Sequence, residues 1–279
     1  MRKTLMTILV SGLVLASCSQ KQGSDNPLLQ TWDTPFETAP FEKIKVEHYL
    51  PAFEAAMAEH DKEIQAIIDN AEAPTFDNTI AALDYSGQTL TKVAGVFYNM
   101  MAANTSEELQ KVNEQIGPMM ATHSDNVSMN AKLFEKIKAV YDAKDSQKYT
   151  GEQLALLEKT YKQFVRSGAL LDAEKQAELR EVNAELTKVE AKFDANLLKE
   201  TKSYQLVIDN QENLKGLPQG EIEKAAALAK QEGKEGKWIF TLDNPSFIPF
   251  VTYADNRDLR KEIFNARVNR CNNGGETDN

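Results

Sequence analysis

The chain contains three histidines and two cysteines, and their spacing limits the metal and nucleophilic chemistry that the sequence can support. The histidines are His48, His60 and His123, and no two of them lie four positions apart. A zinc-binding H-E-x-x-H motif needs two imidazoles one helical turn apart, so that both reach one ion from the same face. Glu47-His48 is therefore not half of such a motif, and we predict no metal ligand in this chain.

Two of the histidines fall among apolar residues. His60 belongs to a run of apolar side chains spaced three and four apart, and His123 follows Met119 and Met120. A histidine on an apolar helix face is usually a core side chain that hydrogen-bonds to a carbonyl or a carboxylate. We predict that role for both, and we expect His48 to be half exposed at the start of a helix.

Other nucleophilic or phosphate-binding motifs are missing from the sequence. Cys271 has no local signature of a reactive cysteine, so we interpret it as a spectator thiol. The segment 233–237 has neither the spacing nor the Ser or Thr of a phosphate-binding loop and is expected to form a turn. No G-x-S-x-G motif occurs. We therefore predict no catalytic residue.

The first 20 residues indicate where the protein is expected to reside. Arg2 and Lys3 precede an apolar run, which ends in Leu15-Ala16-Ser17-Cys18. This order is typical of a bacterial lipoprotein signal peptide, with residues 1–17 removed and Cys18 as the site of lipid attachment. The alternative is an ordinary signal peptide with a chance cysteine. We expect an exported protein, anchored by lipid to the cell envelope at the outer membrane or periplasmic face.

Charge and cysteine content limit the possible partners. Removing Arg2 and Lys3 changes the formal net charge from −10 to −12. An acidic chain without a basic stripe is a poor ligand for nucleic acid, so we predict no nucleic-acid partner. If Cys18 carries lipid, Cys271 has no partner for an internal disulfide, and a hydrophobic core must hold the fold.

Apolar spacings of three and four predict a mainly α fold of several helices. Residues 18–26 form a polar tether, and 27–203 a helical domain. Its proline-rich start, 27–46, is expected to be extended and to pack through Trp32, Phe36 and Phe41. Capping boxes are predicted at Thr105 and Thr150, and a bend or break at Gly117-Pro118. The apolar residues of the longest stripe are expected to pack inside the domain; they are Leu179, Val182, Leu186, Val189, Phe193 and Leu197.

The pattern changes at residue 204, where we place the start of a second, incomplete region that ends at 279. Residues 204–208 and 237–242 are rich in β-branched and aromatic side chains and predict a small two-stranded β element near 204–242. A helix is predicted between them over 219–231, and another over 257–269 after Pro245 and Pro249. We expect Trp238, Phe247 and Phe250 to form an exposed apolar patch.

Several motifs resemble a known family over nearly the whole chain from residue 26. They are Asn26-Pro27-Leu28-Leu29, Glu47-His48-Tyr49-Leu50-Pro51-Ala52-Phe53, Pro74-Thr75-Phe76-Asp77-Asn78-Thr79 and Tyr253-Ala254-Asp255-Asn256-Arg257. These stretches resemble the opening part of bacterial peptidyl-dipeptidases of the Dcp type, in the thimet oligopeptidase family of zinc metallopeptidases. The resemblance implies a helical enzyme with a deep channel, in which zinc bound by H-E-x-x-H releases dipeptides from the C-termini of peptides.

This sequence contains no H-E-x-x-H, so no catalytic or metal residue is carried over from the family. The resemblance implies the N-terminal part of such an enzyme, a wall or lid of the channel, which should be inactive alone. Zinc and peptide substrates are expected only for the complete enzyme, and no cofactor is expected in this chain. Two alternatives stay open: a non-catalytic helical lipoprotein that binds peptides or a partner, and a structural envelope protein.

Overall fold

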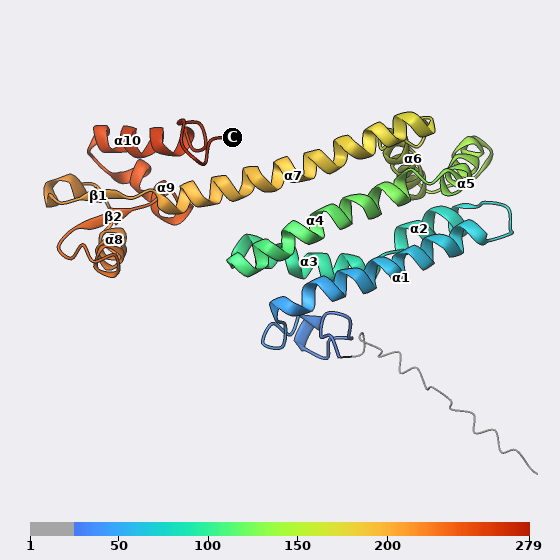
Figure 1. Cartoon of the computed structure of the whole chain (residues 1–279), viewed down its shortest axis with the longest axis horizontal. Helices are drawn as coiled ribbons and strands as arrows, with labels where there is room; N and C mark the ends of the chain where they lie inside the picture. Colours follow the sequence, from blue (N-terminus) through green and yellow to red (C-terminus); the bar gives the residue numbers. More distant parts are fainter. Residues whose placement is uncertain (1–24) are drawn as a thin grey trace, which may run out of the picture. The chain divides into compact units, whose positions relative to one another are not determined.

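The computed structural model describes residues 25–279, and it divides into two compact units (Figure 1). The first unit ends at Asp172 and the second runs from Ala173 to Asn279. The sequence placed a division at 203/204 instead. The two divisions differ by one long helix, Ala173–Ser203. Its contacts assign it to the same unit as the residues that follow it. Cys18, the predicted lipid-attachment residue, lies outside the described residues.

The first unit is built from helices joined by short turns. Two 3-10 turns, Pro35–Glu37 and Val46–His48, precede the first helix, and a π-helical turn, Phe76–Ala81, precedes the second. The helices are α1 (Tyr49–Asp69), α2 (Ala82–Tyr85), α3 (Gln88–Ala103), α4 (Glu107–Ser128), α5 (Ala131–Asp142) and α6 (Gly151–Arg166). Helix α1 packs against α3, α4 and α5, which makes it the central element of the unit (Figure 1).

Helix starts follow the capping residues, with one shift in position. The capping box at Thr150 is confirmed, because its hydroxyl accepts from the Gln153 amide and the Gln153 side chain accepts from the Thr150 amide. The start predicted at Thr105 is wrong by one residue. Ser106 caps α4 instead, accepting a hydrogen bond from the Leu109 amide at 3.2 Å. Both residues can cap a helix, and sequence alone did not distinguish them.

Of the bend or break predicted at Gly117-Pro118, the break is wrong, because α4 continues through both residues to Ser128. Proline removes one backbone donor from the helix. The residues on either side nevertheless face the interior: Ile116 is fully buried and His123 nearly so. Tertiary packing on both sides of the proline therefore outweighs the missing hydrogen bond.

The apolar core of the first unit consists of two clusters along α1. The first cluster joins the N-terminal half of α1, including Phe53, to α3 and to the first half of α4. The second cluster joins the C-terminal half of α1, including Ile64 and Ile67, to α5 and α6. The rings of Phe53 and Phe97 meet edge to face in the first cluster, 5.5 Å apart. Helix α1 therefore serves both clusters with different parts of its length.

The segment before α1 packs only partly as predicted. Trp32 lies against the first cluster, and its indole N–H donates to the carbonyl of Pro27 at 2.8 Å. Phe36 is 98% exposed and Phe41 53% exposed, so the packing predicted for these two rings is wrong. Leu28, fully buried, anchors the segment instead. Proline spacing showed that the segment was not helical but did not show which of its apolar side chains face inward.

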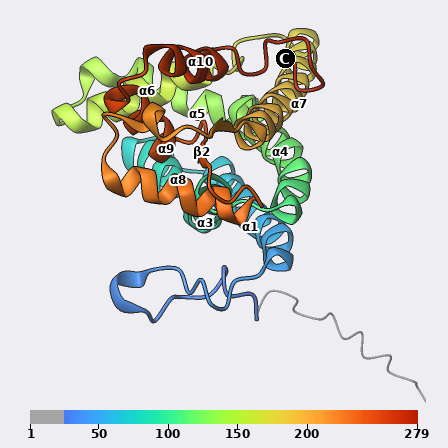
Figure 2. The same ribbon diagram turned by 90° about the vertical axis from the view of Figure 1, so that its left-hand side faces the viewer.

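The second unit holds one long helix and a small mixed α/β body (Figure 2). Its elements are α7 (Ala173–Ser203), β1 (Leu206–Ile208), α8 (Gln219–Gln231), β2 (Trp238–Phe240), α9 (Asn244–Tyr253) and α10 (Arg257–Val268). The strands pair antiparallel, with Leu206 opposite Phe240 and Ile208 opposite Trp238. The predicted two-stranded element is confirmed. The helix predicted between the strands and the helix predicted near the end of the chain are confirmed as α8 and α10.

The exposed apolar patch predicted for the second unit is wrong. Phe250 is fully buried, Phe247 is nearly so, and Trp238 packs against the same apolar cluster. Helix α9 also begins at Asn244 and so contains both prolines, whereas the sequence placed helix only after them. Pro245 lies in the first turn, where a missing N–H costs nothing. The aromatic side chains of α9 thereby close over the two-stranded sheet.

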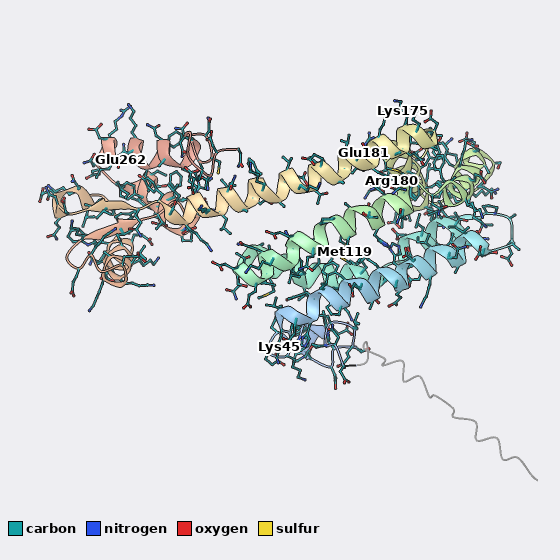
Figure 3. All side chains as sticks on the ribbon, in the orientation of Figure 1. Lys45, Met119, Lys175, Arg180, Glu181 and Glu262 are labelled. Atoms are coloured by element: carbon teal, nitrogen blue, oxygen red, sulfur yellow. The ribbon has the colours of Figure 1, made fainter. Side chains whose placement is uncertain are left out.

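Helix α7 differs from its prediction most strongly. None of its 31 residues is buried, and Val182, Leu186, Val189 and Phe193 are 48–61% exposed. The packing predicted for this stripe inside the domain is therefore wrong. Lys175, Arg180 and Glu181 mark the first turns of the helix in Figure 3. No helix in the described part of the chain is long and apolar enough to cross a membrane.

Candidate functional site

A chain of polar side chains runs between the two apolar clusters of the first unit. His60 interrupts the apolar face of α1 between Met57 and Ile64, and His123 interrupts that of α4. Both helices pass from the first cluster to the second at these positions. The histidines therefore meet where neither apolar cluster fills the space between the helices.

The two imidazoles hydrogen-bond directly to each other. His60 Nδ1 and His123 Nε2 are 2.9 Å apart, although the residues are 63 positions apart in sequence. The other nitrogen of each ring has its own partner: His60 Nε2 lies 3.1 Å from Ser86 Oγ, and His123 Nδ1 lies 3.3 Å from Asp61 Oδ1. The order Ser86–His60–His123–Asp61 thus joins the α2–α3 turn, α1 and α4; we call these four residues the histidine relay.

The turn that carries Ser86 is held to α1 by a second contact. Gly87 has φ +70°, a left-handed conformation that glycine adopts without strain, and its amide donates to Glu63 Oε2 at 2.7 Å. A Cβ at this position would lie 3.3 Å from three ring atoms of His60. The turn therefore needs glycine both for its backbone angle and for its close approach to the imidazole.

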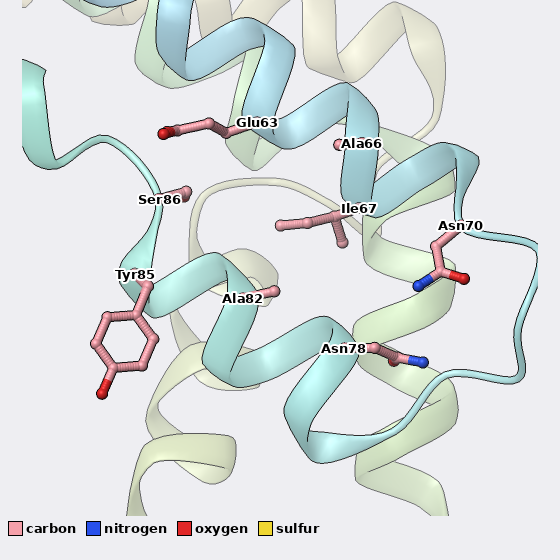
Figure 4. A pocket seen from close by; sticks show the side chains of 8 residues that line it. All are labelled: Glu63, Ala66, Ile67, Asn70, Asn78, Ala82, Tyr85 and Ser86. Carbon is pink, nitrogen blue, oxygen red and sulfur yellow. The ribbon is translucent and has the colours of Figure 1, made fainter.

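A pocket of about 390 Å³ opens beside the relay (Figure 4). Glu63 and Ile67 project into it from α1, and Ala82 and Ser86 come from the opposite side. Its remaining lining residues are Ala66, Asn70, Asn78 and Tyr85. The lining combines apolar side chains with one carboxylate, two amides, the phenol of Tyr85 and the hydroxyl of Ser86 at the end of the relay.

Burial sets the protonation preference of His60. Its pKa is lowered from 6.5, first by burial and then by the charge of His123, against the opposing effects of Glu63 and Asp61. Taking a charged imidazolium out of water is costly, so the partly buried ring favours its neutral form. The neutral imidazole is therefore the favoured form of His60 at neutral pH.

The relay resembles a nucleophile–base–orienter arrangement but lacks an oxyanion site. Ser86 Oγ lies within reach of His60 Nε2, yet it is also 2.7 Å from the carbonyl of Leu83. The nearest amides are occupied, because the Ser86 N–H donates to Leu83 O and the Gly87 N–H to Glu63. Acyl transfer needs free N–H donors aimed at the developing oxyanion. The geometry therefore supports a hydrogen-bonding and proton-holding role.

Metal ligation does not fit the histidine pair either. Within residues 25–279, no group of three or more His, Cys, Asp or Glu side chains comes close enough to hold an ion. Three of the four ring nitrogens of His60 and His123 take part in hydrogen bonds of the relay, and the fourth, His123 Nδ1, lies 3.3 Å from the carboxylate of Asp61. A zinc ion in a relative of this chain would need ligands other than these.

The other residues singled out from the sequence lie apart from the relay. His48 accepts the Lys45 amide at 3.0 Å on Nδ1, in the turn before α1. Cys271, in the second unit, is a buried free thiol, and burial followed by its contact with Glu200 raises its pKa. A raised pKa keeps sulfur in the unreactive thiol form.

A match to a family model covers most of the helices just described. Residues 53–176 match the model for the neurolysin/thimet oligopeptidase N-terminal domain. Residues 53–176 belong to this domain family. All four residues of the histidine relay lie within the matched range.

Whole-chain relatives extend the similarity into the second unit. A dipeptidyl carboxypeptidase of Salmonella typhimurium is 34% identical over 255 residues, which cover 91% of this chain and 38% of the relative. Its Escherichia coli counterpart is 34% identical over 253 residues, 91% of this chain and 37% of that protein. An organellar oligopeptidase A of Arabidopsis thaliana is 29% identical over 257 residues, 90% of this chain and 32% of the relative. The chain thus spans less than two fifths of the length of these relatives.

The relay was not predicted from the sequence alone. A carbonyl or carboxylate partner was expected for both histidines, and that is confirmed for His123, which pairs with the carboxylate of Asp61. For His60 the expectation was wrong, because its partners are a second histidine and a serine hydroxyl. The partners of His60 lie 63 and 26 positions away. No local motif joins such distant residues: the packing of α1 against α4 brings His123 to His60, and the turn between α2 and α3 brings Ser86.

Proposed function

We propose that this chain is the N-terminal part of an exported peptidase that releases dipeptides from the C-termini of peptides. In this proposal the helices of the first unit form a wall or lid of the channel that admits the peptide. The observation that carries it is the similarity to dipeptidyl carboxypeptidases, which extends over 91% of this chain but only 38% of the relative. Similarity that is spread over both units favours a shared architecture over a single shared motif.

The zinc chemistry of such a peptidase would reside outside residues 1–279. A bound zinc ion polarises water so that a neighbouring carboxylate can remove its proton. The histidines of this chain have no zinc-motif spacing, and those of the relay are bonded to each other. The role of this chain would be to bind and enclose the peptide and to restrict access of water, while other residues perform hydrolysis.

Dipeptide release by the complete gene product tests this proposal. We expect the product isolated from its own source to release dipeptides from an N-terminally blocked peptide, and a chelator to stop the reaction. The 279-residue chain, assayed beside it with added zinc, should release none. Dipeptide release by the 279-residue chain alone would overturn the proposal. A natural product of 279 residues that binds peptides without cleaving them would favour the non-catalytic binding protein instead.

Export and lipid attachment are a separate part of the proposal. The basic start, the apolar run and the sequence Leu15-Ala16-Ser17-Cys18 support them. Cells grown with radioactive palmitate should label the wild-type protein, and Cys18→Ala should abolish the label and leave the precursor unprocessed. Cys271→Ser is the matched control, since it removes the only other cysteine and should leave labelling unchanged. Equal labelling of Cys18→Ala and wild type would contradict lipid attachment at Cys18.

A further inference from the structure

The histidine relay has a property that peptide binding does not require. Two hydrogen bonds and the 3.3 Å contact between His123 Nδ1 and Asp61 Oδ1 place the nitrogens of two imidazoles in one continuous line from a hydroxyl to a carboxylate. Each imidazole nitrogen either carries a proton or accepts one, so the direction of every bond depends on that of its neighbour. The number of protons on the pair therefore fixes the direction of the whole line.

With both rings neutral, only one direction satisfies the carboxylate end. Asp61 can only accept, so His123 must carry its proton on Nδ1, and its Nε2 accepts from His60 Nδ1–H. His60 Nε2 is then unprotonated and accepts from the Ser86 hydroxyl. In this state the hydroxyl points at His60, and its 2.7 Å contact with the carbonyl of Leu83 carries no hydrogen.

Adding one proton reverses the line and satisfies that remaining contact. With a proton on both nitrogens of His123, Nδ1–H donates to Asp61 and Nε2–H donates to His60 Nδ1. His60 stays neutral but now carries its proton on Nε2, which donates to Ser86 Oγ, and the hydroxyl turns to the carbonyl of Leu83. Every contact of the relay then pairs one N–H or O–H group with one acceptor atom.

A second proton does not fit. It would leave N–H groups facing each other across the 2.9 Å between His60 and His123, with like charges on adjacent rings. The charged groups that act on His60 are His123 from α4 and Asp61 and Glu63 from α1, and the turn contributes only a hydroxyl. Burial and the charge of His123 outweigh the two carboxylates and lower the pKa of His60.

We propose that Ser86, His60, His123 and Asp61 form a proton-operated latch, in which a single proton on the histidine pair reverses the hydrogen bonds that hold the α2–α3 turn against α1 and α4. The protonated state adds one hydrogen bond, from Ser86 to the carbonyl of Leu83. The neutral state leaves the Leu83 carbonyl free of that bond. Because Ser86 lines the pocket beside Glu63, the proton also changes the polar face that the pocket presents.

Nitrogen NMR of the full chain labelled with ¹⁵N-histidine tests the latch, since only three histidines give signals. At pH 8 we expect His60 to carry its proton on Nδ1. As the pH falls, His60 should change to the Nε2–H form while remaining neutral, at the same pH at which His123 becomes an imidazolium. A His60 that keeps one neutral tautomer until it becomes charged itself, or rings that titrate independently, would overturn the proposal.

Three variants separate the latch from ordinary histidine titration. His123→Gln removes the coupled proton, so the neutral tautomer of His60 should no longer depend on pH between 8 and 6. Asp61→Asn should move the tautomer change to lower pH, because it removes the carboxylate that lies 3.3 Å from His123 Nδ1 and favours the charged ring. His48→Gln, which changes the histidine outside the relay, should leave the transition in place. A transition that survives His123→Gln unchanged would contradict the latch.

Discussion

Helices α1 and α7 carry the same kind of apolar pattern and reach opposite outcomes. Both place apolar residues three and four positions apart, but seven of the 21 residues of α1 are buried and none of the 31 residues of α7. Helix α1 is enclosed by α3, α4 and α5, whereas the stripe of α7 stays exposed. Apolar spacing therefore predicts that a helix has a face to bury, but not that a partner for it is present.

The largest expected effect is on the free energy of unfolding, when a buried phenylalanine of α1 and an exposed phenylalanine of α7 are each replaced by alanine. Phe53→Ala in α1 should lower the free energy of unfolding by about 3–5 kcal/mol, because it opens a cavity beside Phe97 in a fully buried site. Phe193→Ala in α7, where the ring is 48% exposed, should change it by no more than about 0.5 kcal/mol. Urea denaturation followed by circular dichroism measures both. Equal losses would show that the α7 stripe is packed after all.

A smaller effect on stability is expected when two glycines, one in the α2–α3 turn and one in α3, are replaced by alanine. The two replacements should change stability in opposite directions. Gly87→Ala should destabilise by about 1–2 kcal/mol, because alanine is strained at φ +70° and its Cβ would press on the His60 ring. Gly95→Ala, inside α3 with nothing within 4 Å of the new methyl group, should stabilise by about 0.5–1 kcal/mol. The same denaturation assay compares the two variants. Stabilisation by Gly87→Ala would contradict the close packing of the turn on α1.

The smallest expected effect is a dependence of stability on pH that arises from His60 in α1. The pKa of His60 is lower in the folded chain than its ordinary value of 6.5, so the unfolded chain binds more protons in mild acid. Stability from this group is complete above pH 6.5 and decreases as the pH falls below it. Thermal melting between pH 7.5 and 5.5 should show a steeper decline for wild type than for His60→Gln. The opposite ranking would mean that folding raises the pKa of His60.

The sequence predicted local structure correctly where residue types and spacings within a few positions determine it. The strands at 206–208 and 238–240, the helix at 219–231 and the cap at Thr150 all follow from residue type and short spacing. Proline misled the prediction in α4 and α9, because packing of the neighbouring residues outweighed one missing donor. The burial of Phe250 and the exposure of Val182 depend on which elements meet, and residue type carries little of that information.

The candidate site was less predictable than the fold. Two positions that looked like ordinary core histidines form the centre of the relay, and their partners lie on a different helix and in a turn. The turn depends on a left-handed Gly87, whose role is visible only next to the ring of His60. Hydrogen-bond chains between distant residues follow from the folded arrangement, whereas an H-E-x-x-H motif can be read locally because one helix carries both ligands.

The central claim, that this chain is the N-terminal part of a peptidase, is tested most directly by the nucleotide sequence that follows codon 279 in the source genome. We predict a continuing reading frame, in the same frame or one frameshift away, that encodes H-E-x-x-H and a further glutamate downstream. A stop codon followed by unrelated sequence, in an independently determined genome, would contradict the claim and favour a helical binding protein that acts without catalysis.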